Sequence, residues 1–291
     1  MSASFSTAAF SSQRNIGTRI RAPLTFAGAC LILAATTMPA GAQEAVILQT
    51  EDAPAPPAVD DGSGGDWTFV LGAGARIGPS YEGSDHFSVT PGPFVSVNWR
   101  DRIFLDMEYG LGVNVVRTEA LRLGLSIDMA PGRDEDDDDH LKGLGDIDAA
   151  ARGHVFGSYS FGMVQLGLDI AKDFGGSEGL QIRPGVSVKV PLSESWTLSS
   201  GLSATWADDD YMQTFFGVSP SQSRRSGLER FDAGAGFKSL DFRVGLNWQI
   251  SESWVAITSV NVGVLLGDAA DSPITQSEVQ PSVGLALGYR F

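Results

Sequence analysis

The chain has 291 residues, a formal net charge of −15 and 35 glycines. Nucleic acid is excluded as a partner, because binding it relies on Lys and Arg side chains that neutralise phosphates. The single cysteine, Cys30, excludes internal disulfides and thiolate metal clusters.

The N-terminal segment 1–42 has the features of a secretory signal peptide. Arginines precede a short apolar run, and Ala40-Gly41-Ala42 supplies a small-residue cleavage site. Cys30 lies inside this segment, so the mature chain is expected to have no thiol. Residues 43–65 are rich in Pro, Asp and Gly, which predicts a flexible periplasmic arm.

The remaining residues, 66–291, show apolar side chains at every second position in successive stretches. A period of two predicts β-strands with one apolar and one polar face. The stretches are 67–77, 87–99, 121–129, 164–170, 182–190, 196–206, 240–250, 254–266 and 283–291. Most have about the 9–11 residues that cross a bilayer at a tilt. We therefore expect an all-β fold, an antiparallel transmembrane β-barrel.

The connections between these stretches alternate between short and long. Short turns are expected at 100–102, 158–160, 193–195 and 251–253, and long, mostly acidic loops at 131–146, 207–236 and 267–278. Outer-membrane barrels place short turns in the periplasm and long loops outside. Tryptophans concentrate at strand ends on the short-turn side, which predicts an aromatic girdle at one membrane interface. They are Trp67, Trp99, Trp196, Trp248 and Trp254.

The segment 103–115 decides the number of strands. Its apolar residues keep one parity throughout, so as a single strand it would give an odd total. Bacterial single-chain barrels have even numbers of strands. A tight hairpin near Glu108-Tyr109-Gly110 gives about twelve strands, and a segment that does not cross gives about ten. We favour twelve, because Gly110 and Gly112 permit a bend.

The last strand ends on an aromatic residue. Tyr289 and Phe291 conclude an alternating pattern that is typical of the closing strand of outer-membrane barrels. Such a strand is the predicted signal for the barrel-assembly machinery. Because a barrel leaves no free edge, this strand should pair with the one that starts at Trp67.

Polar residues on the opposite face of the strands are candidates for lining the lumen. They are Arg122, Arg183, Lys189, Asp241 and Arg243. In the lumen they would either line a water-filled pore or lock a closed barrel by ion pairing.

Two loops carry further candidate sites. Asp136, Asp137, Asp138 and Asp139 form the densest carboxylate run, which suits a solvated external loop better than the oxygen cage of a divalent cation. In 207–236, acids mix with Tyr211, Phe215 and Phe216, which either contact a partner or pack over the barrel mouth.

Catalysis is not expected. The three histidines show no metal-ligand spacing, and no nucleophile, base and orienting group stand in register. No cofactor motif is present in the sequence. We therefore predict neither an enzyme nor a cofactor.

Four ordered stretches resemble the family of MltA-interacting proteins, also called the MipA/OmpV family. They are Pro79–Asp85, Asp136–Asp148, Asp209–Ser219 and Leu265–Ile274, joined by the terminal Tyr289-Arg290-Phe291. The resemblance covers nearly the whole mature chain and implies an outer-membrane barrel of a Gram-negative bacterium. Such a barrel would contact outer-membrane lipid and lipopolysaccharide.

The named role of the family is a scaffold that joins a lytic murein transglycosylase to a penicillin-binding protein. Other members are treated as porins or adhesins, so a narrow channel for small solutes and a surface adhesin stay open as alternatives. The resemblance supplies no catalytic residues.

Overall fold

The computed structural model describes residues 66–291, so the predicted signal peptide and arm lie outside the described residues. These residues form a closed barrel of antiparallel strands in the order β1 to β12 around the wall. The strands are β1 (Trp67–Pro79), β2 (Phe87–Trp99), β3 (Ile103–Asp106), β4 (Gly110–Arg117), β5 (Leu121–Ala130), β6 (Ala150–Phe161), β7 (Val164–Phe174), β8 (Leu180–Pro191), β9 (Trp196–Ala207), β10 (Gly236–Gln249), β11 (Trp254–Leu265) and β12 (Val279–Arg290). The predicted twelve-strand, all-β barrel is confirmed.

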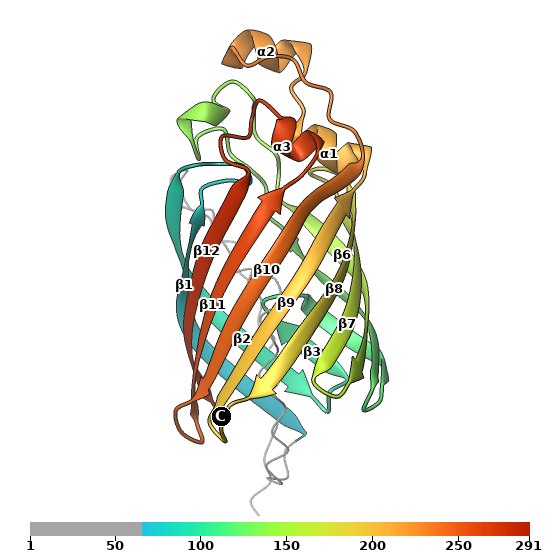
Figure 1. Cartoon of the computed structure of the whole chain (residues 1–291), viewed down its shortest axis with the longest axis vertical. Helices are drawn as coiled ribbons and strands as arrows, with labels where there is room; N and C mark the ends of the chain where they lie inside the picture. The colour runs from blue at the N-terminus through green and yellow to red at the C-terminus, as the bar shows by residue number, and fades with distance from the viewer. Residues whose placement is uncertain (1–65) are drawn as a thin grey trace, which may run out of the picture. The chain divides into compact units, whose positions relative to one another are not determined.

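Helices occur at one end of the barrel. They are η1 (Asp139–Leu141), α1 (Asp209–Phe216), α2 (Pro220–Ser226) and α3 (Asp268–Asp271). Figure 1 shows them among the long loops, with the C-terminus at the opposite, short-turn end. In the part of the chain that the structure describes, no helix is long and apolar enough to cross a membrane.

The two faces of the wall differ as the alternation predicts. Large apolar side chains such as Leu71, Leu125, Leu166 and Phe242 point outward and are exposed. Their inward neighbours are mostly glycines and polar or charged residues, with Val70 beside Leu71 as an apolar exception. A broad exposed apolar surface is unfavourable in water and favourable in lipid, so the outer face suits a bilayer.

The aromatic girdle is formed at the short-turn end. Trp67 lies opposite Trp99 with ring centroids 5.9 Å apart, and Trp196 stacks on Trp248 at 4.8 Å. Trp254 contacts Tyr289 at 5.2 Å in an edge-on arrangement. These pairs join neighbouring strands where amphipathic aromatic rings are expected at a membrane interface.

The segment 103–115 folds as the predicted hairpin, but neither of its strands crosses the full wall. Asp106 pairs with Gly110, and the turn amides of Glu108 and Tyr109 donate to the Asp106 carboxylate. This carboxylate closes the turn as an Asx motif. Because β3 has only 4 residues, the turn lies within the barrel rather than at the long-loop end. There Met107 packs against a lumen cluster of Val70, Phe94, Val255 and Ile257.

The short hairpin leaves an edge on β2. Among the described strands, β2 pairs with β3 only from Val97 to Trp99. The Arg100 amide donates to the Asp66 carbonyl, so even-numbered residues at this end of the β1–β2 pair bond to β1. Because N–H groups alternate in direction along a strand, the odd-numbered residues of β2 direct theirs away from β1. Pro91 and Pro93 occupy two of these positions and have no N–H to leave unpaired, as is typical of edges.

One predicted turn is wrong. The turn expected at 158–160 lies inside β6, and the chain reverses at Gly162 and Met163 instead. Gly162 has φ of 64°, a left-handed conformation that glycine adopts without strain. The serines at 158 and 160 belong to the inward face of β6. Their polarity resembles that of a turn, which is why the sequence predicted a turn there.

The barrel closes between its first and last strands, as predicted. β1 pairs with β12 from Val70 opposite Arg290 to Ile77 opposite Val283, and the Phe291 amide donates to the Phe69 carbonyl. Gly72 faces Gly288 across this seam. A side chain at Gly72 would collide with the backbone oxygen of Leu287, so the seam requires glycine there.

Replacing Gly72 with alanine is therefore expected to destabilise the barrel by about 1–3 kcal/mol, because the β12 backbone must shift. Urea unfolding in detergent micelles measures this free energy. Gly167→Ala is the matched control, since nothing lies within 4 Å of its added methyl group. Equal stability of the two variants would contradict the seam argument.

Candidate functional site

The long-loop end is closed by a layer built from the β1–β2, β5–β6, β9–β10 and β11–β12 loops, here called the loop layer. One apolar cluster joins all four loops through Tyr81, Leu141, Leu144, Val218 and Ile274. The β5–β6 and β11–β12 loops stand half the circumference apart in the strand order. Contacts between them must therefore cross the mouth of the barrel.

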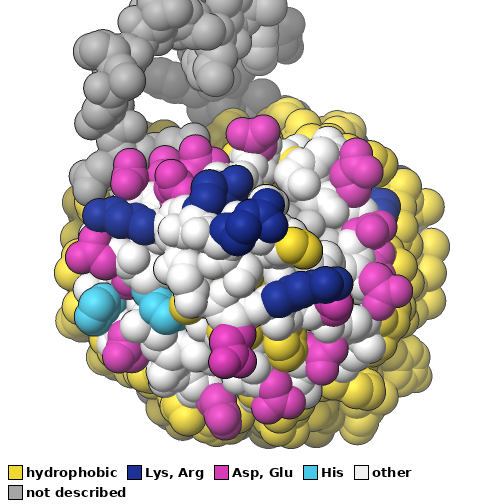
Figure 2. Space-filling model, turned by 90° about the horizontal axis from the view of Figure 1, so that it is seen from above, with side chains coloured by type: hydrophobic (Ala, Val, Ile, Leu, Met, Phe, Trp, Pro, Cys, Tyr) yellow, Lys and Arg dark blue, Asp and Glu magenta, His cyan; other side chains and the backbone are white. Residues whose placement is uncertain are grey.

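A hydrogen bond also connects the β5–β6 and β11–β12 loops across the mouth of the barrel. The Nε2 atom of His140, in the β5–β6 loop, lies 2.9 Å from the carbonyl oxygen of Pro273, in the β11–β12 loop. Viewed from above, the space-filling surface of this end shows acidic and basic side chains mixed over a continuous face (Figure 2). The lumen is thus covered at the long-loop end.

Helix α1 anchors a second apolar cluster of the loop layer. Asp208 caps its first turn by accepting from the Tyr211 amide, which satisfies an otherwise unpaired donor. Phe216 is 0% exposed, and Tyr211 is also buried. Phe215 is half-buried beside them, and its carbonyl accepts from Arg133 at 2.6 Å. The three aromatic candidates thus lie inside the loop layer, packed against other loop residues.

Three of the four carboxylates from Asp136 to Asp139 have separate partners. Asp139 pairs with Lys142 at 2.7 Å, and Asp137 accepts from the Asp134 amide. Asp138 caps η1 through the His140 amide. Within residues 66–291, no three His, Cys, Asp or Glu side chains are placed to hold a metal ion.

Asp138 also fastens the β5–β6 loop to the β1–β2 loop. Its carboxylate lies 3.0 Å from Nδ1 of His86 and accepts from the Ser84 hydroxyl at 3.3 Å. The hydrogen bond with Asp138 and its charge raise the pKa of the exposed His86. Burial opposes ionisation of Asp138, but bonds from the His140 amide and from His86 hold its pKa below the ordinary value.

These opposite shifts predict a pH window for the His86–Asp138 contact. A raised histidine pKa stabilises the contact fully below about pH 6.5, and this contribution is lost as the pH rises through the pKa of the folded state. A lowered aspartate pKa stabilises it above about pH 3.9, and this contribution is lost as the pH falls through the folded-state pKa. The contact is therefore strongest between these values.

Hydrogen exchange of 134–142, normalised for the intrinsic pH dependence, should show greatest protection between about pH 4 and 6.5. His86→Ala should remove the loss of protection above that range. An unchanged profile in this variant would contradict the assignment.

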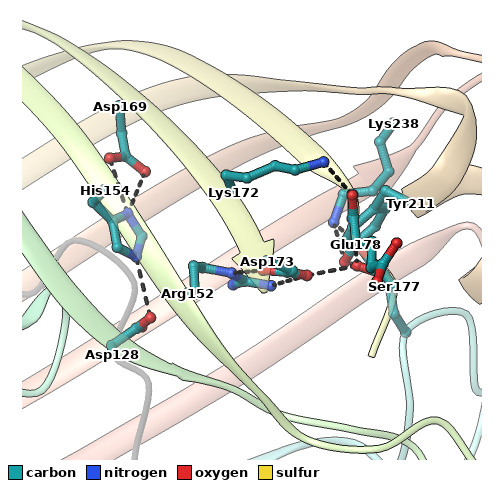
Figure 3. A network of polar contacts seen from close by, with 12 residues as sticks. Asp128, Arg152, His154, Asp169, Lys172, Asp173, Ser177, Glu178, Tyr211 and Lys238 are labelled. Carbon is teal, nitrogen blue, oxygen red and sulfur yellow. Dashed lines mark hydrogen bonds and ion pairs between the residues drawn. The ribbon is translucent and has the colours of Figure 1, made fainter. Parts of the chain in front are cut away.

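Below the loop layer, polar side chains make a series of contacts inside the barrel (Figure 3). Lys238 of β10 pairs with Glu82 of the β1–β2 loop at 2.7 Å, and the Tyr211 hydroxyl lies 3.4 Å from both groups. Burial raises the pKa of Tyr211 to about 12, so its hydroxyl keeps its proton near neutral pH. These contacts tie the loop layer to the wall.

The next contacts toward the short-turn end join β6 and β7. Arg152 donates to both oxygens of Asp173, at 2.5 and 3.2 Å, and Ser177 donates to the same carboxylate at 2.6 Å. The Arg152 and Asp173 side chains are 9% and 3% exposed. A bidentate guanidinium–carboxylate pair is the strongest geometry for such a contact.

His154 lies between two carboxylates in the middle of the lumen. Its Nδ1 atom is 3.1 Å from both oxygens of Asp169, and its Nε2 atom is 3.2 Å from Asp128. This arrangement suits a ring in which both nitrogens donate. The edge of Tyr109 from the β3–β4 turn covers the ring at 5.6 Å. The contacts hold the hairpin turn inside the barrel.

A cavity of about 710 Å³, here called the vestibule, fills the lumen toward the short-turn end. All five lumen candidates from the sequence line it. Sequence reasoning missed Arg117 and Asp101, which also line it, because both stand at strand ends or turns. It also missed Arg152 and His154, although both share the inward parity of β6 and could have been found from it.

Comparisons with known proteins give one family. A family model described as MltA-interacting protein MipA matches residues 71–291. No curated protein matches the sequence.

Solved structures that resemble the barrel are distant from it in sequence. The translocator domain of autotransporter NalP from Neisseria meningitidis is 12% identical, with a TM-score of 0.39 over 79% of this chain and 90% of that chain. Outer-membrane expressed OmpT of Vibrio cholerae is 10% identical, with a TM-score of 0.34 over 78% and 97%.

Proposed function

The chain belongs to the MltA-interacting protein MipA family, and from this premise we propose that it is a scaffold for murein enzymes. Its partner would be a lytic murein transglycosylase, and a penicillin-binding protein would be the second client. The barrel itself is an outer-membrane protein. The short-turn end would face the periplasm and the loop layer the outside, which is the usual orientation of such barrels.

The observation that carries the proposal is the loop layer. Apolar and polar contacts between opposite loops cover the mouth, so the barrel offers a rigid support rather than an open path. The girdle would hold the short-turn end at the membrane interface, where a periplasmic enzyme could reach it. The turns there expose acidic residues, among them Glu194 and Glu252. These turns and the arm 43–65 are the surfaces available to a periplasmic partner.

The test is capture of a purified lytic transglycosylase by the purified barrel. Glu194→Lys with Glu252→Lys reverses charge at the short-turn end, and removal of 43–65 deletes the arm. Glu178→Lys with Glu229→Lys is the matched control, because it reverses the same number of exposed glutamates at the opposite end of the barrel, in the β7–β8 and β9–β10 loops. We expect at least one short-turn or arm variant to lose about 10-fold in affinity, as for a charge contact at an interface. Full capture by both, or loss only in the control, would contradict the proposal.

A channel is the second candidate, and the vestibule is the observation that favours it. Its volume of about 710 Å³ and its charged lining would suit small solutes. Passage would require the loop layer to open. Arg183→Ala or Arg243→Ala would then alter the ion selectivity of the conducting state. A scaffold that does not conduct would give no current in the parent chain or in either variant.

A further inference from the structure

The vestibule reaches the short-turn end of the barrel. Its lining includes the turn residues Asp101 and Met163 and the last residue, Phe291. In the other direction it extends to Asp169 and Asp241 in the middle of the lumen. Solutes on the short-turn side therefore have a polar chamber in front of them, with the loop layer as its far end.

Three cationic side chains converge in this chamber. Arg117 of β4 stands directly opposite Arg122 of β5 in the ladder. Lys189, near the short-turn end of β8, lines the same cavity. Like charges placed opposite each other are unfavourable unless something neutralises them.

The neighbours of these cations supply little compensation. The nearest carboxylate to Arg117 is that of Asp101, at 4.0 Å. Arg122 donates to the neutral amide oxygen of Asn114 at 2.7 Å, and its guanidinium lies over the rings of Phe104 and Phe156. Within residues 66–291, the Lys189 ammonium makes no hydrogen bond or ion pair.

Besides Asp101, the lining contains the acids Asp106, Glu108, Asp169 and Asp241. Asp106 accepts from the amides of its own hairpin turn, and Asp169 faces His154. Asp241 accepts from the Ser239 hydroxyl at 2.8 Å. Arg117, Arg122 and Lys189 thus have no carboxylate within hydrogen-bonding distance among the described residues, and walls of low dielectric concentrate their field.

We propose that the vestibule binds a small solute bearing a carboxylate or phosphate group, held by Arg117, Arg122 and Lys189. Guanidinium groups match the paired oxygens of either anion, and an ammonium adds a point charge. Arg122 is already oriented by Asn114 and the two rings, so less side-chain entropy is lost when it binds. Serines at 158, 187 and 199 line the same cavity and offer hydroxyls to the rest of the solute.

The test is isothermal titration of the full mature chain, in zwitterionic micelles at low salt, with inorganic phosphate and with citrate. We expect at least one probe to bind, and Lys189→Ala to weaken binding about 10-fold, the value of one hydrogen bond to a charged group. The choice between the probes distinguishes phosphate from carboxylate ligands. Binding of either probe that Lys189→Ala weakens supports the site, and binding that Lys189→Ala leaves unchanged overturns it.

Lys142→Ala is the matched control, because it removes the same charge from an exposed loop lysine paired with Asp139. It should bind as the parent does. Lys189→Gln keeps the polar chain and serves where the alanine variant folds poorly, with heat-modifiable gel migration reporting the folded barrel. The proposal is overturned if neither probe binds, or if Lys142→Ala weakens binding as much as Lys189→Ala. It does not depend on the scaffold role, since titration uses no partner protein.

Discussion

Arg152→Met is expected to lower the free energy of unfolding by about 3–5 kcal/mol. The variant leaves the Asp173 carboxylate, 3% exposed, without its bidentate partner inside the lumen. An uncompensated buried charge costs far more than the lost contact alone. Urea unfolding of the barrel in lipid vesicles, followed by tryptophan fluorescence, measures the change.

Two further variants give this prediction its contrast. Arg152→Met with Asp173→Leu replaces both charges by apolar groups and should recover most of the loss. Arg100→Met removes an exposed partner from Asp66, whose bond is 2.6 Å long, and should cost less than about 1 kcal/mol. If Arg152→Met alone were no less stable than Arg100→Met, the Arg152–Asp173 pair would not be buried as described.

Phe216→Ala should destabilise the loop layer by about 3–5 kcal/mol while the barrel wall stays folded. Phe216 is 0% exposed and packs with Met212, Leu265 and Ala269, so its removal leaves a cavity in the layer. We expect rapid proteolysis within 207–236 and intermittent ion conductance through the uncovered mouth.

Phe161→Ala is the matched control for that experiment. Phe161 is exposed at the short-turn end of β6, far along the strand from the loop layer. Its replacement should leave loop proteolysis unchanged. If the loop of Phe216→Ala resisted proteolysis as well as that of Phe161→Ala, the cluster around α1 would not be what holds the mouth closed.

The wall of the barrel could be predicted from the sequence because its signal is local and repeated. In the run from Leu240 to Ile250, alternation alone separates the lipid face from the lumen face. It therefore assigns Asp241 and Arg243 to the lumen face. The hairpin at 106–110 could also be predicted, since an even number of strands left only this hairpin or a segment that does not cross, and Gly110 permits the bend. Only its short strands were unforeseen, because apolar parity continues through the turn.

The ionic contacts of the lumen could not be predicted, because they depend on register. A turn centred on Tyr159 would place Arg152 opposite Leu166. The reversal at Gly162 and Met163 places it opposite Asp173 instead. A shift of a few residues therefore decides whether a buried charge finds its partner.

The loop layer was the least accessible part. His140 and Pro273 are 133 residues apart in sequence, and no strand ladder connects their loops. One local signal was available: Ser219 and Gln222 form a capping box, with Pro220 in the first turn of α2. It predicts a helix in the long loop but not where that helix packs.

The lumen of this barrel ends at the loop layer. Current through planar bilayers containing the purified mature chain tests this most directly. We expect no conductance steps for the parent chain and steps for Phe216→Ala. Stable ohmic steps from the parent chain, unchanged in Phe216→Ala, would contradict it and favour a channel.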